Sequence, residues 1–404
     1  AFFAGNATAD NAIINLNGGQ ASFSGTTTGG TSQWNMEGNS RLDLTSSNAI
    51  TGSGLRGITI GSLAGSSSTA TIEIGGYPEM LGGPGRELSV CAIDLSTSFA
   101  GQIINGGDSN SGPGSLVKVG TGRLTLYGTN TYSGTTTVTA GTLQIGNGGT
   151  TGSLGTATVF NDGQLSFNRS DAITVANFIN GFGGLSQIGT GTLTLGASNS
   201  YSGGTTIQNG AVNLGATSAL GTGEVSFASV GGSTPVLRSL VSGTIANTVF
   251  WGSGVTATTA AAAGTTVNFT GNALVSANAT AVYGSATDTG TVIVSSASGS
   301  FDATSSIRID GGTLRAGSFA LIAGLMTSAS TTVAAGATLD INDQTHTHNG
   351  QTASWLRNLN GLGTVRTGSN ATTQIAIGQG TFGGSITGAG GLHLTDVLTT
   401  TGGT

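Results

Sequence analysis

Acidic side chains are the groups in this chain that could act on a sugar polymer, and they are few and widely separated. The 404 residues include 17 Asp and Glu. Cleavage of a glycosidic bond needs a general acid and a general base within a few ångströms of each other. No two acidic residues recur at a spacing that would align them in neighbouring repeats. We therefore predict no catalytic residue, and a polysaccharide lyase or hydrolase built from distant positions stays as the least favoured alternative.

Two histidines at alternate positions offer the best case for a metal site. His346 and His348 would project from one face of a strand, and Asp340 and Asp343 precede them closely. A closed zinc site needs further ligands held together, so one pair of His is a weak signal. We predict no metal and no cofactor. Cys91, the single cysteine, has no His nearby and is expected to be a buried thiol.

Composition argues against two further classes of partner, nucleic acids and lipid bilayers. Eleven Lys and Arg are scattered along a chain of net charge −6, whereas binding to phosphates needs clustered basic residues. The glycine strings 106–114 and 146–152 lack the Lys-Ser/Thr ending of a phosphate-binding loop. No run approaches the ~20 apolar residues of a membrane helix, and no leader pattern opens the chain. We expect a processed form or an excerpt, with no membrane insertion within these residues.

A long internal repeat indicates which elements carry these side chains. Residues 120–145, GTGRLTLYGTNTYSGTTTVTAGTLQI, return as GTGTLTLGASNSYSGGTTIQNGAVNL at 189–214. Leu124 and Leu126 alternate with polar residues, as in a strand with one buried face. Asn or Gly follows nearly every strand, where a sharp corner needs it. The pattern predicts stacked coils of about 20 to 25 residues, three to each repeat.

The predicted architecture is an all-β solenoid, one continuous and elongated rod over residues 1–404. Its best-preserved part is the repeat pair at 99–223. Apolar side chains such as Leu193 are expected along its axis, where each contributes roughly 1.5 to 3 kcal/mol on full burial. Tyr132 and Tyr201, at equivalent repeat positions, are expected to pack over a corner.

Two segments interrupt the alternating pattern. Residues 76–90 carry two of the four prolines, and Pro cannot donate to a sheet ladder, so we predict a loop that protrudes from the rod. Its candidate partner-binding residues are Tyr77, Glu79, Arg86 and Glu87. A surface excursion without a partner is the interpretation we favour over a binding loop. Residues 252–264 have no bulky side chain, which predicts a wide turn or a thin-walled coil.

The repeat resembles the passenger-associated repeat of bacterial autotransporter proteins. The motif residues are Leu116-x-Lys118-x-Gly120-x-Gly122, Asn130-Thr131-Tyr132-x-Gly134 and Gly141-x-Leu143-x-Ile145. The second copy keeps the tyrosine as Tyr201 and has Gln187 in place of the lysine. The resemblance implies a right-handed parallel β-helix on the outside of a bacterium, extracellular or on its outer surface.

Three functional hypotheses follow from these observations. The first is a non-catalytic structural or adhesive rod, whose partner is a protein or a glycan on another surface. The second is a subunit of an extracellular fibre that self-associates head to tail through open coil ends. The third is the polysaccharide-active enzyme, for which the sequence offers no site.

Overall fold

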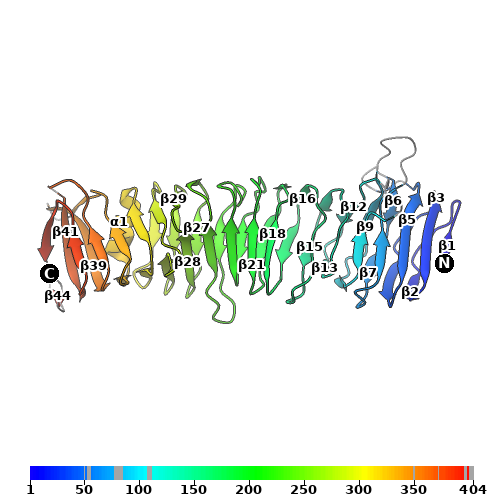
Figure 1. Ribbon diagram of the computed structural model, residues 1–404, viewed down its shortest axis with the longest axis horizontal. Coiled ribbons are helices and arrows are strands. Elements are labelled where there is room, and N and C mark those ends of the chain that lie inside the picture. Colours follow the sequence, from blue (N-terminus) through cyan, green and yellow to red (C-terminus); the bar gives the residue numbers. More distant parts are fainter. Residues whose placement is uncertain are drawn as a thin grey trace. The chain divides into compact units, whose positions relative to one another are not determined.

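The computed structural model describes residues 1–49, 51, 56–76, 85–106, 112–348, 351–371, 373–394 and 398–399. The chain divides into two compact units, residues 1–192 with 199–203 and residues 193–198 with 204–404. Short parallel strands make up nearly all the regular structure of each unit (Figure 1).

The first unit contains four sets of hydrogen-bonded parallel strands. One set is β1 (Phe2–Phe3), β3 (Gln20–Gly25), β5 (Arg41–Ser47), β8 (Thr71–Glu73) and β11 (Gln102–Ile104). A second is β2 (Ile13–Asn17), β4 (Gln33–Glu37) and β7 (Ser62–Ala64). A third is β10 (Thr97–Phe99), β13 (Arg123–Leu126), β15 (Thr142–Ile145), β17 (Gln164–Phe167) and β20 (Gly184–Gln187). The fourth is β6 (Gly57–Thr59), β9 (Glu87–Val90), β12 (Ser115–Lys118), β14 (Thr136–Val138), β16 (Val159–Asn161) and β19 (Ile179–Asn180). The remaining strand is β18 (Ala172–Val175).

Strands of one set are successive turns of a coil. Leu124 pairs with Leu143, Leu143 with Leu165 and Leu165 with Leu185, so these coils are 19, 22 and 20 residues long. All four leucines are buried, because every second residue of a strand points to the inside of the coil. Consecutive strands such as β9, β10 and β11 belong to three different sets, so one coil has three sides. The parallel β-helix and the approximate coil length are confirmed.

The prediction that one repeat equals three coils is wrong, because one repeat covers three coils and one further side of a coil. Three coils onward from Leu116, through Thr136 and Val159, the chain reaches Ile179, 63 residues later. The repeat counterpart of Leu116 is Leu185, which lies six residues further on and pairs with β17 in a different sheet. The second copy therefore begins one side further round the coil than the first.

The second unit has the same construction. One set of strands is β22 (Thr205–Ile207), β24 (Val225–Phe227), β27 (Val249–Trp251), β30 (Ala273–Val275) and β33 (Gly299–Phe301). A second is β23 (Ala211–Leu214), β25 (Val236–Ser239), β28 (Thr256–Ala261), β31 (Thr280–Tyr283), β34 (Ser306–Ile309), β36 (Ser330–Val333), β39 (Gln351–Gly361), β41 (Gln374–Thr381) and β43 (Gly391–Leu394). A third is β26 (Gly243–Ile245), β29 (Thr266–Phe269), β32 (Thr291–Val294), β35 (Thr313–Ala316), β37 (Thr338–Asp340), β40 (Thr364–Arg366) and β42 (Ser385–Thr387). β38 (His346–His348) is antiparallel to β39, β44 (Leu398–Thr399) pairs with β41, and β21 (Thr192–Leu195) spans the sequence boundary of the units.

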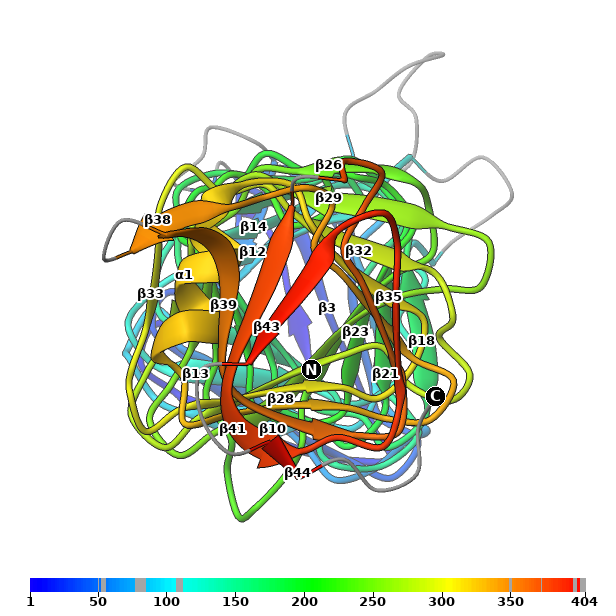
Figure 2. The same cartoon turned by 90° about the vertical axis from the view of Figure 1, so that its left-hand side faces the viewer.

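One α-helix interrupts the strands of the second unit in the described part of the chain. Helix α1 (Phe319–Thr327) follows Ser318, whose hydroxyl caps it by accepting from the Ala320 N–H. It contacts β33 and β39 and lies against β39 in Figure 2. Leu321 and Leu325 are fully buried in this contact region. The helix is nine residues long, and no helix among the described residues is long and apolar enough to cross a membrane.

Several local predictions can be compared with the structure. Leu193 is buried, as expected for an axial residue, and Tyr132 and Tyr201 are fully buried. Residues 252–264 contain strand β28, in which Ala257, Ala260 and Ala261 are buried, so the region is a thin-walled coil and not a wide turn.

Candidate functional site

The lysine of the repeat motif lies inside the coil. Lys118 is fully buried, and its Nζ donates to the carbonyl oxygens of Val119 (2.6 Å), Gly120 (2.8 Å) and Ala140 (3.2 Å). Burial lowers the pKa of this ammonium group. In the second copy, the Gln187 amide donates to two carbonyl oxygens of its own corner, at 2.9 and 3.1 Å. Both side chains stabilise corners and are closed to ligands.

The asparagine and tyrosine of the motif are also structural. Asn130 joins three coils, because its Oδ1 accepts from the Ile103 N–H (2.9 Å) and its Nδ2 donates to the Ser153 carbonyl (2.7 Å). The Tyr132 hydroxyl lies 2.7 Å from Thr136 Oγ1, and burial raises the pKa of this phenol. The residues that define the repeat thus hold coils together, and any surface function belongs to other positions.

An acidic pair does align across neighbouring coils, contrary to the prediction from the sequence. Asp43 of β5 and Glu73 of β8 are register partners. Arg41 binds both: its Nε and Nη2 donate to the two Glu73 oxygens at 2.6 and 2.5 Å, and Nη2 lies 3.3 Å from Asp43 Oδ2. Thr45 donates its N–H and hydroxyl to the other Asp43 oxygen. Both carboxylates are occupied as acceptors, so the group cross-links two coils.

The acidic residues considered for a metal site have other partners. Asp340 is buried between Arg315, at 2.9 Å, and Arg366, at 3.8 Å. Asp343 accepts hydrogen bonds from the backbone N–H groups of Asn370 and Ser369, which lower its pKa. His346 and His348 form β38. No group of three or more His, Cys, Asp or Glu suited to a metal occurs in the described part of the chain.

The remaining sequence candidates are mostly buried or undescribed. Cys91 is buried, as predicted, and desolvation raises the pKa of its thiol, which makes it unreactive. Arg86 and Glu87 are also buried, and Glu87 begins strand β9, so the end of the loop predicted over 76–90 is a buried strand, while residues 77–84 lie outside the described part. Tyr77 and Glu79 lie outside the described residues. The four residues therefore stay a prediction from the sequence as a partner-binding site.

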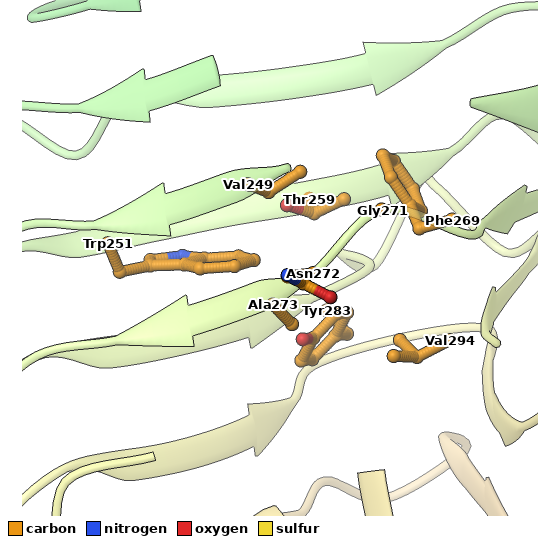
Figure 3. Close-up of a pocket in the computed structure, with 9 residues that line it drawn as sticks. All are labelled: Val249, Trp251, Thr259, Phe269, Gly271, Asn272, Ala273, Tyr283 and Val294. Atoms are coloured by element: carbon orange, nitrogen blue, oxygen red, sulfur yellow. The ribbon is translucent and has the colours of Figure 1, made fainter. Parts of the chain in front are cut away.

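A small internal cavity lies between coils of the second unit (Figure 3). Its space of about 10 Å³ is closed by aromatic side chains that include Trp251, Phe269 and Tyr283. The Tyr283 hydroxyl and Thr259 Oγ1 have no hydrogen-bond partner among the described residues. Burial raises the pKa of Tyr283 far above its usual range. The space suits a single water at most, so it is a packing defect of the core and not a ligand site.

Larger hollows open on the outside of the coils. One, of about 300 Å³ in the second unit, is lined by Thr, Ser, Gly, Ala and Asn. A second, also about 300 Å³, contains Arg169, whose guanidinium is bound by Asp171 and by carbonyl oxygens. The third, which we call the corner hollow, is about 220 Å³ and is lined by Ser66, Ser68, Ala100, Gln102, Tyr127, Gly128, Thr129 and Thr151.

Several aromatic rings of the first unit are exposed, Phe2 (72%) among them. Phe160, Phe178 and Phe182 are 43%, 42% and 83% exposed. Tyr127 is half-buried at the corner hollow. Sequence reasoning did not single out Tyr127, although its outward position in the alternation and its replacement by Gly196 in the second copy were visible.

Comparisons with known proteins agree with the motif. The passenger-associated-transport-repeat family matches residues 116–145 and 185–214. Over 86 residues, the chain is 45% identical to the adhesin BmaC autotransporter of Brucella suis biovar 1 (strain 1330). This region is 21% of the chain and 2% of the relative's length. No solved structure matches.

Proposed function

We propose that this chain, an autotransporter passenger segment with two passenger-associated repeats, is an adhesive and non-catalytic β-helix. The segment lies outside the cell or on the bacterial outer surface, as its repeats and its relative indicate. The named relative is an adhesin. Adhesion is therefore the function that we propose for the surface of this chain.

One observation carries the proposal: the aligned acidic pair and the motif lysine are used between or inside coils, while several aromatic rings stay exposed on the outer surface. The guanidinium of Arg41 holds both carboxylates of the aligned acidic pair, and Lys118 is closed inside a corner. Phe160, Phe178 and Phe182 remain exposed. Aromatic side chains are the residues that carry most binding energy at protein surfaces, so this distribution favours binding over catalysis.

The adhesive role is tested with beads coated with the folded 404-residue chain. We expect these beads to attach to cultured mammalian cells more than beads coated with serum albumin or with the Leu193→Asp variant. Leu193 lies in the core, so a charge there disrupts the fold. This variant shows whether attachment requires the folded surface. Equal attachment of all three preparations would remove the support for adhesion.

The non-catalytic part needs a separate assay. The chain is incubated with polygalacturonate, alginate and chitin, and unsaturated products and new reducing ends are measured. We expect none above the level of a Glu73→Gln, Asp43→Asn double variant. Release of product by the unaltered chain, lost in the double variant, would assign catalysis to the acidic pair held by Arg41.

A further inference from the structure

We propose that the corner hollow binds a neutral glycan, with a sugar ring against Tyr127 and hydrogen bonds to Gln102 and the surrounding hydroxyls. The inference rests on the proposed adhesive function and names the chemical class of its ligand. The hollow, of about 220 Å³, is below the roughly 300 Å³ at which pockets for drug-sized ligands begin. It therefore suits one end residue of an oligosaccharide.

Four successive coils build the hollow. Ser66 and Ser68 follow β7, Gln102 begins β11, Tyr127 and Thr129 follow β13, and Thr151 comes from the next corner. Gly128 forms part of the floor, where a Cβ would lie 1.9 Å from the Gly101 carbonyl oxygen. Because no side chain fits there, the space between Tyr127 and the surrounding hydroxyl groups stays open.

The polar groups around the hollow are free to bind. The side chains of Gln102, Thr129 and Thr151 are exposed and make no hydrogen bond to any residue that the structure describes. The Tyr127 hydroxyl has none either within that part of the chain. By contrast, Ser66 donates its hydroxyl and N–H to the Glu37 carboxylate. An aromatic face beside unoccupied amide and hydroxyl groups matches the apolar and hydroxyl faces of a sugar.

The charge of the hollow favours a neutral sugar. No Lys, Arg or His is among the described residues that line it. Glu37, which is bound to Ser66, places a carboxylate at its rim. Sialylated and sulfated glycans would meet this negative charge without a cation to pair with them. A protein partner is less well matched, because protein hot spots need apolar anchors that fill a desolvated pocket.

The two repeat copies provide an internal comparison. The second copy has Gly196 where the first has Tyr127, yet it keeps the Leu, Asn and Tyr positions that fill the coil. The repeat therefore folds without a tyrosine at this place. Tyr127 is an addition to the outer surface of the first copy and not a requirement of its architecture.

The experiment uses the purified chain on immobilised neutral oligosaccharides that end in galactose, N-acetylglucosamine, mannose or fucose, with sialylated and sulfated forms alongside. We expect binding to at least one neutral oligosaccharide and about tenfold weaker binding after Tyr127→Gly or Gln102→Ala. Ile13→Ala, which removes an exposed apolar side chain elsewhere on the unit, should bind unchanged. Circular dichroism verifies that each variant is folded.

Each outcome decides the inference. Absence of binding to every neutral oligosaccharide, preference for the anionic forms, or equal binding by all variants would overturn it. Attachment of chain-coated beads to cells, unaltered by Tyr127→Gly and abolished by protease treatment of the cells, would point to a protein partner and overturn it while adhesion stands. Failure of bead attachment with retained, Tyr127-dependent glycan binding would keep the inference and reject adhesion.

Discussion

At the scale of single residues, the repeat motif specifies corner chemistry. The ammonium of Lys118 and the amide of Gln187 stand at equivalent repeat positions and donate to carbonyl groups of the corner that follows each strand. Lysine is therefore replaceable here by another donor of similar reach. An apolar side chain is not an equivalent replacement, since it would leave these carbonyl oxygens buried without donors.

We predict opposite results for two substitutions of Lys118. Lys118→Gln should change the free energy of unfolding little, whereas Lys118→Met should lower it by about 1 to 3 kcal/mol. Urea unfolding followed by circular dichroism measures both. Equal stability of the Met variant and the unaltered chain would show that the buried ammonium contributes nothing to the corner.

Carboxylates that accept backbone and hydroxyl donors predict sensitivity to acid. The N–H of Thr121 lowers the pKa of Asp94, the Arg169 side chain that of Asp171, and the N–H of Asn370 that of Asp343. A carboxylate whose pKa is lower in the folded than in the unfolded chain stabilises the fold. This stabilisation is complete at pH values above the pKa in the unfolded chain, about 4, and it is lost as the pH falls through the pKa in the folded chain.

The melting temperature should therefore be nearly constant from about pH 7 to 5 and fall below about pH 4. Asp343→Asn, which keeps the shape but not the charge, should lower the melting temperature at pH 7. The difference between the melting temperatures at pH 7 and pH 3 should therefore be smaller in this variant than in the unaltered chain. Differential scanning calorimetry across this range is the measurement. A melting temperature at pH 3 equal to that at pH 7 would contradict the prediction.

At the scale of elements, strands were predictable and their alignment was not. The period of two in residues such as Leu124 and Leu126 gives the strands directly. The pairing of Asp43 with Glu73 was missed because the coil between them is 30 residues long, more than the 20 to 25 expected. The length of a loop within a coil sets the register, and no local pattern in the sequence reports it.

Helix α1 was missed for a related reason. Its short apolar run can be read equally as a buried strand, and periodicity does not separate the two. Gly324 packs under the Phe301 ring of β33, so the helix fits closely on its neighbour. The corner hollow was missed because its residues come from four coils whose stacking is not visible in the sequence.

We predict that α1 stabilises the coils on both of its sides. Leu325→Ala should cost about 2 to 5 kcal/mol, because Leu325 is fully buried. Hydrogen exchange should become faster in β33 and β39, which α1 contacts. Thr327→Ala on the exposed end of the helix is the control. Unchanged exchange in both strands would show that α1 is only an attached loop.

At the scale of the whole molecule, stability is the sum of many similar coils. Each coil buries its apolar side chains mainly against its neighbours, so a charge on the axis should affect several of them. We predict that Leu193→Asp weakens the β signal in circular dichroism and opens new sites to limited proteolysis. An unaltered spectrum and digestion pattern would show that the neighbouring coils tolerate the charge.

The rod and fibre hypotheses are separated by electron microscopy. One continuous rod formed by both units would give single particles of one length at all protein concentrations. Head-to-tail association would give filaments that lengthen with concentration. We predict single particles, since adhesion requires no self-association. Filaments from purified chain at low concentration would favour the fibre.

The offset between the two repeat copies affects how a longer chain of such repeats would meet its surroundings. The first strand of copy one, β12, and its counterpart in copy two, β20, belong to different sheets of a three-sided coil. Each further copy of this length would be rotated about the coil axis by one side of the coil relative to the copy before it. A receptor approaching from a fixed direction would then face about one copy in three. Duplication would thereby place the surfaces of successive copies on every side of such a chain.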